Sequence, residues 1–151
     1  MIISIVIPAF NEAKYLPNTL KAIKNSNRVF NSVGWESEIV VCDNNSTDAT
    51  SKIATENGAR VVFEPFNQIS SARNSAAQAA KGDWLVFVDA DTQVSAELFR
   101  AMMRAIVSGN CIGGGAPVKF DNGPWLACKT VHIWNAMAKI MSWAAGSFLF
   151  C

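Results

Sequence analysis

Apolar and polar residues alternate along this chain in blocks that predict strands and helices in turn. Short apolar runs rich in β-branched residues are typical of buried strands. Such runs occupy residues 2–7, 38–42, 60–63 and 84–89. Stretches with helical character separate and follow these runs. The predicted helices cover residues 16–23, a segment capped by Ser46 or Thr47 that ends at Gly58, residues 70–81, and a segment capped by Ser95.

The order of these blocks predicts the fold class. Strand–helix units repeat three to four times within about 110 residues, which is typical of an α/β fold with a doubly wound, mostly parallel sheet and helices on both faces. Residues 25–35 are polar, and we expect a loop there. Gly82 is expected to end the helix over 70–81 as its C′ residue. Further along, the pattern predicts a helix over 125–143 and a turn and strand over 144–150.

Polar loops follow three of the predicted strands, at residues 8–12, 43–46 and 89–91. Parallel strands bring their carboxyl ends to the same edge of a sheet, so we expect the three loops to share one crevice. Open α/β sheets bind their ligands at such an edge. The first strand is not followed by Gly-x-Gly-x-x-Gly, and there is no Walker lysine motif, so dinucleotide and P-loop sites have no support.

Two carboxylates, Asp89 and Asp91, directly follow the apolar run over 84–88. Their charges repel at this spacing, and a divalent cation would relieve the repulsion. Oxygen ligands suit Mg²⁺ or Mn²⁺, and Mg²⁺ is often held by one or two carboxylates together with substrate phosphates. The pair therefore indicates a metal-bridged diphosphate. Asp-x-Asp triplets are common, and a solvated loop with a helix-capping aspartate is the alternative.

Length and composition limit the classes of protein. A chain of 151 residues is long enough for one domain with its own core. Its net charge of +1 and lack of basic runs argue against a nucleic-acid partner. The cysteines and the single histidine have no metal-ligand spacing, so we expect free thiols in a reducing compartment, the cytoplasm or the inner face of the membrane. We expect neither a signal peptide at the first residues nor a transmembrane span in this sequence.

Five segments carry a family resemblance. They read IVIPAFNE at residues 5–12, EIVVCDNNSTDAT at 38–50, SARN at 71–74, GDWLVFVDAD at 82–91 and GSFL at 146–149. In this order they resemble the signatures of family 2 glycosyltransferases, which are inverting enzymes with the GT-A fold. The resemblance implies a single GT-A domain, Rossmann-like and doubly wound, over residues 1–151. It also implies a hexosyltransferase-type activity on a nucleotide-diphosphate sugar, with uridine as the favoured nucleoside.

The resemblance implies roles for two of the polar loops. Asp91 would coordinate Mn²⁺ or Mg²⁺ directly, and Asp89 would reach the ribose or the metal through water, with Ala90 between them in the donor site. Asp43 or Asn44 would read the edge of the base, since a carboxylate or amide oxygen can accept from uracil N3–H. The alternative for Asp43 is that it only caps the following helix.

The first loop and the third signature complete the expected donor site. Pro8, Ala9, Asn11 and Glu12 would bind the nucleoside, where a small Ala9 permits close approach. Asn11 could also cap the first helix. Arg73 would meet a phosphate or the base of the nucleotide, and the alternative is that it pairs with a surface carboxylate.

The expected acceptor is a glycan, a lipid or a polyprenyl phosphate, in the synthesis of a cell-envelope polysaccharide. Members of the family continue past the segment GSFL into a motif that supplies the general base. We therefore expect that base beyond Cys151, in a chain that is truncated at its C-terminus. The alternative is a donor-binding module or fragment without turnover. A sugar-nucleotide pyrophosphorylase is disfavoured, because its glycine-rich loop is absent after the first strand.

Two further expectations concern partners. The tryptophan-bearing helix over 125–143 is expected to pack on the core, with a peripheral membrane contact as the alternative. The apolar end over 144–151 predicts a homodimer if it is exposed.

Overall fold

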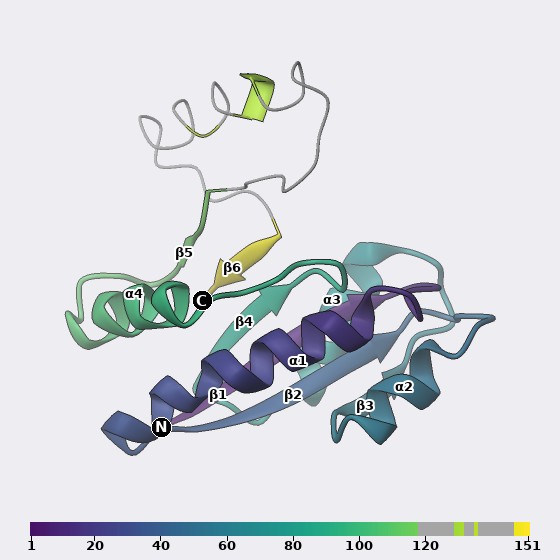
Figure 1. The fold of residues 1–151 in the computed structure, drawn as a ribbon, viewed down its shortest axis with the longest axis horizontal. Coiled ribbons are helices and arrows are strands. Elements are labelled where there is room, and N and C mark those ends of the chain that lie inside the picture. The colour runs from purple at the N-terminus through teal and green to yellow at the C-terminus, as the bar shows by residue number, and fades with distance from the viewer. Residues whose placement is uncertain (118–128, 132–134, 136–146) are drawn as a thin grey trace.

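The computed structural model describes residues 1–117, 129–131, 135 and 147–151, and it shows an α/β fold (Figure 1). The elements, in chain order, are β1 (Ile2–Ala9), α1 (Leu16–Ser26), the 3₁₀ helix η1 (Asn27–Val33), β2 (Glu36–Asp43), α2 (Thr50–Glu56), β3 (Arg60–Phe63), α3 (Ile69–Ala79), β4 (Trp84–Val88), α4 (Ala96–Val107), β5 (Gly114–Gly115) and β6 (Phe148–Phe150). All the predicted strands are present, and their boundaries move by two residues at most.

The strands form one mixed sheet in the order β3-β2-β1-β4-β6-β5. The first four strands in chain order run parallel to one another. β6 is antiparallel to β4, and β5 is antiparallel to β6. Since β1 lies between β2 and β4, the loops after these three strands meet at the centre of one sheet edge, as predicted.

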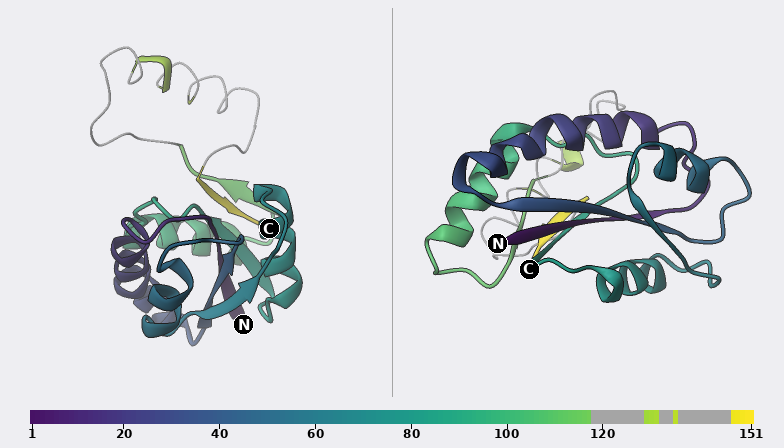
Figure 2. Two further views of the ribbon diagram at one scale, coloured as in Figure 1. Left: turned by 90° about the vertical axis from the view of Figure 1, so that its right-hand side faces the viewer. Right: turned by 90° about the horizontal axis from the view of Figure 1, so that it is seen from below.

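Helices cover both faces of the sheet (Figure 2). On one face, Ile3, Ile5 and Ile7 of β1 are buried in the main core with α1, η1 and α4. On the other face, Val6 packs with Ala72 and Ala76 of α3. The alternation along β1 sends successive side chains to opposite faces, and both are apolar because both are covered. The doubly wound arrangement is confirmed.

Residues 27–33 form a 3₁₀ helix where a loop was predicted. The cause is Phe30, which is fully buried and lies 5.0 Å, centroid to centroid, from Phe99 of α4. One aromatic side chain therefore fixes a polar segment against the core. Gly34 ends the segment with a positive φ of 70°.

Two predicted helix boundaries are wrong. α2 begins at Thr50, and the side chain that accepts from its first backbone N–H belongs to Asp48, at 2.9 Å. Ser46 and Thr47 therefore do not cap it. α3 ends with Ala80 in extended conformation, and Gly82 is not a left-handed C′ residue. Gly82 is small because the chain passes close to Ser4 there.

The last residues form an internal strand. Phe148 and Phe150 of β6 are buried, so the apolar end from residue 147 onward is not the exposed surface that predicted a homodimer. Residues 129–131 and 135 are helical, as predicted, whereas Trp125, Trp134 and Trp143 and residues 144–146 lie outside the described residues. Among the helices that are described, none is long and apolar enough to cross a membrane.

Candidate functional site

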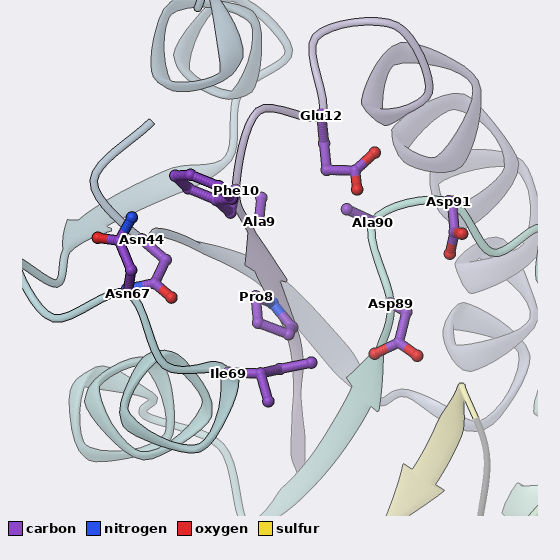
Figure 3. A pocket seen from close by; sticks show the side chains of 10 residues that line it. All are labelled: Pro8, Ala9, Phe10, Glu12, Asn44, Asn67, Ile69, Asp89, Ala90 and Asp91. Atoms are coloured by element: carbon purple, nitrogen blue, oxygen red, sulfur yellow. The ribbon is translucent and has the colours of Figure 1, made fainter. Parts of the chain in front are cut away.

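A pocket of about 450 Å³ opens at the carboxyl edge of the parallel strands (Figure 3). The segments after β1, β2, β3 and β4 all contribute to it, so the predicted convergence of polar loops is confirmed. Its lining residues are Pro8, Ala9, Phe10, Glu12, Asn44, Asn67, Ile69, Asp89, Ala90 and Asp91.

The loop after β1 is fastened to the loop after β2 by Asn11. Asn11 has a positive φ of 54°, its backbone N–H donates to Ser46 Oγ at 3.0 Å, and its Oδ1 accepts from the backbone N–H of Thr47 at 2.8 Å. Asn11 therefore does not cap α1, whose N-cap residue is Tyr15. It is also absent from the pocket lining and acts on the shape of the loop instead.

Glu12 is the acidic residue of the first loop that lines the pocket. Its backbone N–H donates to Thr50 Oγ1 at 2.8 Å, and the next N–H, of Ala13, donates to Asp48 Oδ2 at 3.1 Å. Burial, followed by the nearby carboxylates of Asp91 and Asp48, raises the pKa of Glu12 above its ordinary value. Negative charge is thus concentrated beside Asp91.

Asp43 and Asn44, the two neighbours considered for the edge of the base, have different surroundings. Asp43 is buried, and its Oδ1 accepts from the backbone N–H of Ser46 at 3.0 Å, so it stabilises the turn after β2. Asn44 lines the pocket, and its Nδ2 donates to the carbonyls of Glu64 and Phe66. Asn44 therefore holds the segment after β3 against the pocket.

The motif after β4 is held by three separate elements. Arg73 of α3 pairs with Asp89, with Nη2 and Oδ1 at 2.7 Å. The backbone N–H of Asp89 donates to the carbonyl of Ser147 at 3.1 Å. The carbonyl of Ala90 accepts from Thr19 Oγ1 of α1 at 2.7 Å. Asp89 and Asp91 follow β4 directly, so the predicted position of both carboxylates at the strand end is confirmed.

Asp91 is left without a hydrogen-bond or ion-pair partner among the described residues, while Asp89 is paired with Arg73. Arg73 thus pairs with a carboxylate of the pocket and not with a surface carboxylate. The guanidinium is partly buried, and none of the residues that the structure describes forms a hydrogen bond with its Nε.

The donor set fits a divalent cation that shares its ligands with a substrate. In the part of the chain that the structure describes, no three His, Cys, Asp or Glu side chains form a cluster that could hold a metal ion. Asp91 and Glu12 supply carboxylate oxygens on one side of the pocket (Figure 3). Mg²⁺ and Mn²⁺ are commonly bound in this way, by one or two carboxylates with phosphates and water completing the shell.

Sequence reasoning missed Phe10, Asn67 and Ile69 in the pocket lining. Phe10 sits inside the first signature, and its side chain is 46% exposed at the pocket. Asn67 lies between β3 and α3, and Ile69 is the first residue of α3. The available signal was the parallel direction of the third strand, which brings its carboxyl end to the same edge as the other loops.

Comparison of the sequence with known proteins identifies the family of this chain. The model of the family described as Glycosyl transferase family 2 matches residues 4–141. An uncharacterized glycosyltransferase of Mycobacterium tuberculosis is 32% identical over 127 residues, which cover 83% of this chain and 54% of that protein. The chain thus spans about half the length of its mycobacterial relative.

Two solved structures show the same fold. Residues 1–349 of S. aureus TarS superpose with a TM-score of 0.70 at 25% identity, over 82% of this chain and 37% of that one. The mannosyltransferase PcManGT from Pyrobaculum calidifontis, in complex with GDP-Man and Mn²⁺, has a TM-score of 0.75 at 19% identity, over 98% of this chain and 43% of that one. A further structure of the TarS fragment contains UDP-GlcNAc. With a doubly wound sheet, a pocket at its carboxyl edge and a family match over most of its length, this chain belongs to glycosyl transferase family 2 and has the GT-A fold.

Proposed function

We propose that this chain binds a nucleotide-diphosphate sugar in the pocket at the carboxyl edge of the sheet, and that it forms the donor half of an inverting hexosyltransferase. The observation that carries the proposal is the carboxylate of Asp91 in this pocket, which has no hydrogen-bond or ion-pair partner among the described residues and lies next to the Arg73–Asp89 ion pair. The known GT-A structures that contain UDP-GlcNAc, or GDP-Man with Mn²⁺, support the class of ligand.

The nucleoside is assigned to the part of the pocket formed by the segments after β1, β2 and β3. Pro8, Ala9 and Phe10 offer an apolar surface, and Asn44 and Asn67 offer amide groups. Uracil presents alternating donors and acceptors on its edge, which amides can match. Asp43 and Asn11 act behind this surface by holding the loops.

The diphosphate is assigned to the side formed by Glu12, Ala90 and Asp91. Mn²⁺ or Mg²⁺ bound there would neutralise the charge that develops on the leaving diphosphate. Asp91 would be the protein ligand of that cation, and Asp89 would accept from a ribose hydroxyl.

The acceptor and the general base are assigned outside the described residues. Between residues 92–117 and over 147–151, the only carboxylate is Glu97, which is exposed, pairs with Arg100 at 3.5 Å and does not line the pocket. A hydroxyl acceptor, on a glycan or lipid, needs a base, whereas a polyprenyl phosphate does not. The same observation supports the second candidate, a donor-binding module without turnover.

A cytoplasmic location, at the inner face of a membrane when the acceptor is lipid-linked, is part of the proposal. This part of the proposal is based on the state of the cysteine thiols in the described residues. Cys42, Cys111 and Cys151 are free. Burial and the carboxylates of Glu64 and Asp43 raise the pKa of the Cys42 thiol to about 11, which keeps it protonated and unreactive. Disulfides are rare in such reducing compartments.

Calorimetric titration of UDP, with and without Mn²⁺, tests the donor site. We expect UDP to bind only with the metal, and Asp91→Asn to weaken binding at least about tenfold because it removes the charge that faces the cation. Asp83→Asn is the matched control, since its carboxylate accepts from the backbone N–H of Ile2 at the opposite edge of the sheet, at 2.8 Å.

Equal binding of UDP without metal, or in Asp91→Asn, would contradict the assigned metal ligand. If UDP does not bind at all, GDP and TDP are titrated under the same conditions. Failure of all three would contradict the donor site.

A further inference from the structure

The ion pair between Arg73 and Asp89 divides the two carboxylates of the motif after β4. Resting on the proposed donor site, we infer that Arg73 reserves Asp89 for the nucleoside and keeps it from the cation. Asp91 is then the one carboxylate of the motif that is available to a metal, and the metal binds tightly only together with the diphosphate of the donor.

Asp89 is held in place through both its side chain and its backbone. Its carboxylate pairs with Arg73 Nη2 at 2.7 Å, and its backbone N–H and carbonyl bond to the carbonyl of Ser147 and the N–H of Thr92, at 3.1 and 3.0 Å. The carboxylate therefore cannot turn towards Asp91 without breaking a charge-assisted hydrogen bond.

The pair uses one oxygen of the carboxylate. Oδ1 of Asp89 is occupied by Arg73, while Oδ2 has no hydrogen-bond partner among the described residues. A carboxylate with one oxygen fixed and one open can accept a hydroxyl in a defined direction. This suits a ribose better than a cation, which would have to lie beside the guanidinium.

Charge explains why the metal needs the donor. A guanidinium remains protonated at every accessible pH, so its repulsion of a divalent cation at Asp89 is permanent. Without Asp89, the described residues offer the cation only Asp91, with Glu12 nearby, and no cluster of three ligands. The diphosphate supplies both the missing oxygens and the missing negative charge.

The bonding of Arg73 shows that its position depends on Asp89. Arg73 lies in α3, on the face of the sheet that carries Val6, and its Nε is buried with no hydrogen-bond partner in the described part of the chain. The contact with Asp89 is the only hydrogen bond that the described residues provide to this guanidinium. Removing the arginine would therefore free the carboxylate and leave the α3 packing at Ala72 and Ala76 unchanged.

The test is a titration of Mn²⁺, in which electron paramagnetic resonance measures the free ion. It is carried out first with Mn²⁺ alone and then with saturating UDP. In the wild-type chain we expect UDP to tighten Mn²⁺ binding at least about tenfold. Arg73→Met should tighten the binding of Mn²⁺ alone by roughly tenfold, because Asp89 becomes a second ligand. Arg73→Lys keeps the charge and should bind Mn²⁺ alone as weakly as the wild type.

Two variants isolate the cause. Arg60→Met removes an arginine from another ion pair of the sheet, that with Glu38 at 2.9 Å, and should not change Mn²⁺ binding. Asp89→Asn combined with Arg73→Met should cancel the gain, as expected when two residues act through one interaction.

The outcomes separate this inference from the proposed function. If Mn²⁺ and UDP bind together but Mn²⁺ alone binds equally tightly to the wild type, or Arg73→Met leaves it unchanged, only the inference is overturned. If UDP does not bind, both fail. Should Arg73→Met not fold, as judged by circular dichroism, Asp89→Asn decides: with saturating UDP its Mn²⁺ affinity should stay within about threefold, and a tenfold loss would overturn the inference.

Discussion

Thr50 links the two loops that border the pocket, although it lies outside the pocket itself. Its side chain is fully buried at the start of α2. Its Oγ1 accepts from the backbone N–H of Glu12 at 2.8 Å and donates to Asp48 Oδ1. One hydroxyl therefore sets where the Glu12 backbone lies, and through it where the Glu12 carboxylate enters the pocket.

At the residue scale we predict that Thr50→Val is destabilising. Valine keeps the shape but leaves the Glu12 N–H without its acceptor, which should lower the free energy of unfolding by about 1–3 kcal/mol in urea titration. Thr55→Val, which removes an exposed hydroxyl from the same helix, should change it by less than about 0.5 kcal/mol. Equal effects of the two variants would contradict this role of Thr50.

At the scale of elements, the connection from α3 into β4 passes close to the backbone of β1. Gly82 lies in this connection, and its backbone N–H donates to Ser4 Oγ of β1 at 2.8 Å. Ser4 Oγ in turn donates to Glu38 Oε1 of β2, at 2.6 Å. The connection after α3 is thus hydrogen-bonded to β1 and, through Ser4, linked to β2. These bonds help to set the position of α3, and with it that of Arg73, along the strands.

At the element scale we predict that Gly82→Ala disrupts this connection. A Cβ at Gly82 would lie 2.6 Å from the backbone nitrogen of Ser4 and 2.9 Å from the carbonyl oxygen of Ile2. Backbone atoms cannot give way cheaply, so we expect a loss of about 1–3 kcal/mol in the free energy of unfolding.

The matched control for this element is Gly58→Ala. Gly58 has a positive φ of 70° but open space around it, so its cost is backbone strain alone, roughly 1 kcal/mol. A smaller loss in Gly82→Ala than in Gly58→Ala would show that β1 and α3 can separate without cost.

At the scale of the whole molecule, the sheet is completed by β6, a strand from the last residues of the sequence. β6 lies between β4 and β5, and the backbone of Cys151 exchanges two hydrogen bonds with Leu85, at 2.8 and 3.0 Å. Phe148 is 3% exposed and lies 6.0 Å from Phe99, centroid to centroid. Without β6, β4, the strand that directly precedes Asp89, would be an open edge.

At the scale of the whole molecule we predict that Phe148→Ala lowers the free energy of unfolding by about 3–5 kcal/mol, because it leaves a cavity between the sheet and α4. Phe66→Ala removes a side chain that is 71% exposed and should cost less than about 0.5 kcal/mol. Thermal and urea unfolding compare the two. A small effect of Phe148→Ala would mean that the core closes without β6.

Much of the fold and of the pocket could be predicted because the relevant signals are local. Apolar runs located the strands, and Ser95 was correctly predicted as a cap, since its Oγ accepts from the N–H of Leu98 at 3.2 Å. The parallel order of the strands was enough to bring Glu12, Asn44 and Asp91 to one edge. The segment at residues 27–33 was missed because a single buried ring, Phe30, outweighs the polar residues around it.

The sequence by itself determined the strand–helix order, the edge at which the pocket lies and the family, because each depends on short-range periodicity or on motifs read along the chain. Only the tertiary structure decided that Asn11 bonds to Thr47, that Arg73 pairs with Asp89, and that β6 enters the sheet beside β4. These contacts join residues from separate elements. Several orientations of those elements satisfy the same local pattern, and packing around one core selects a single one.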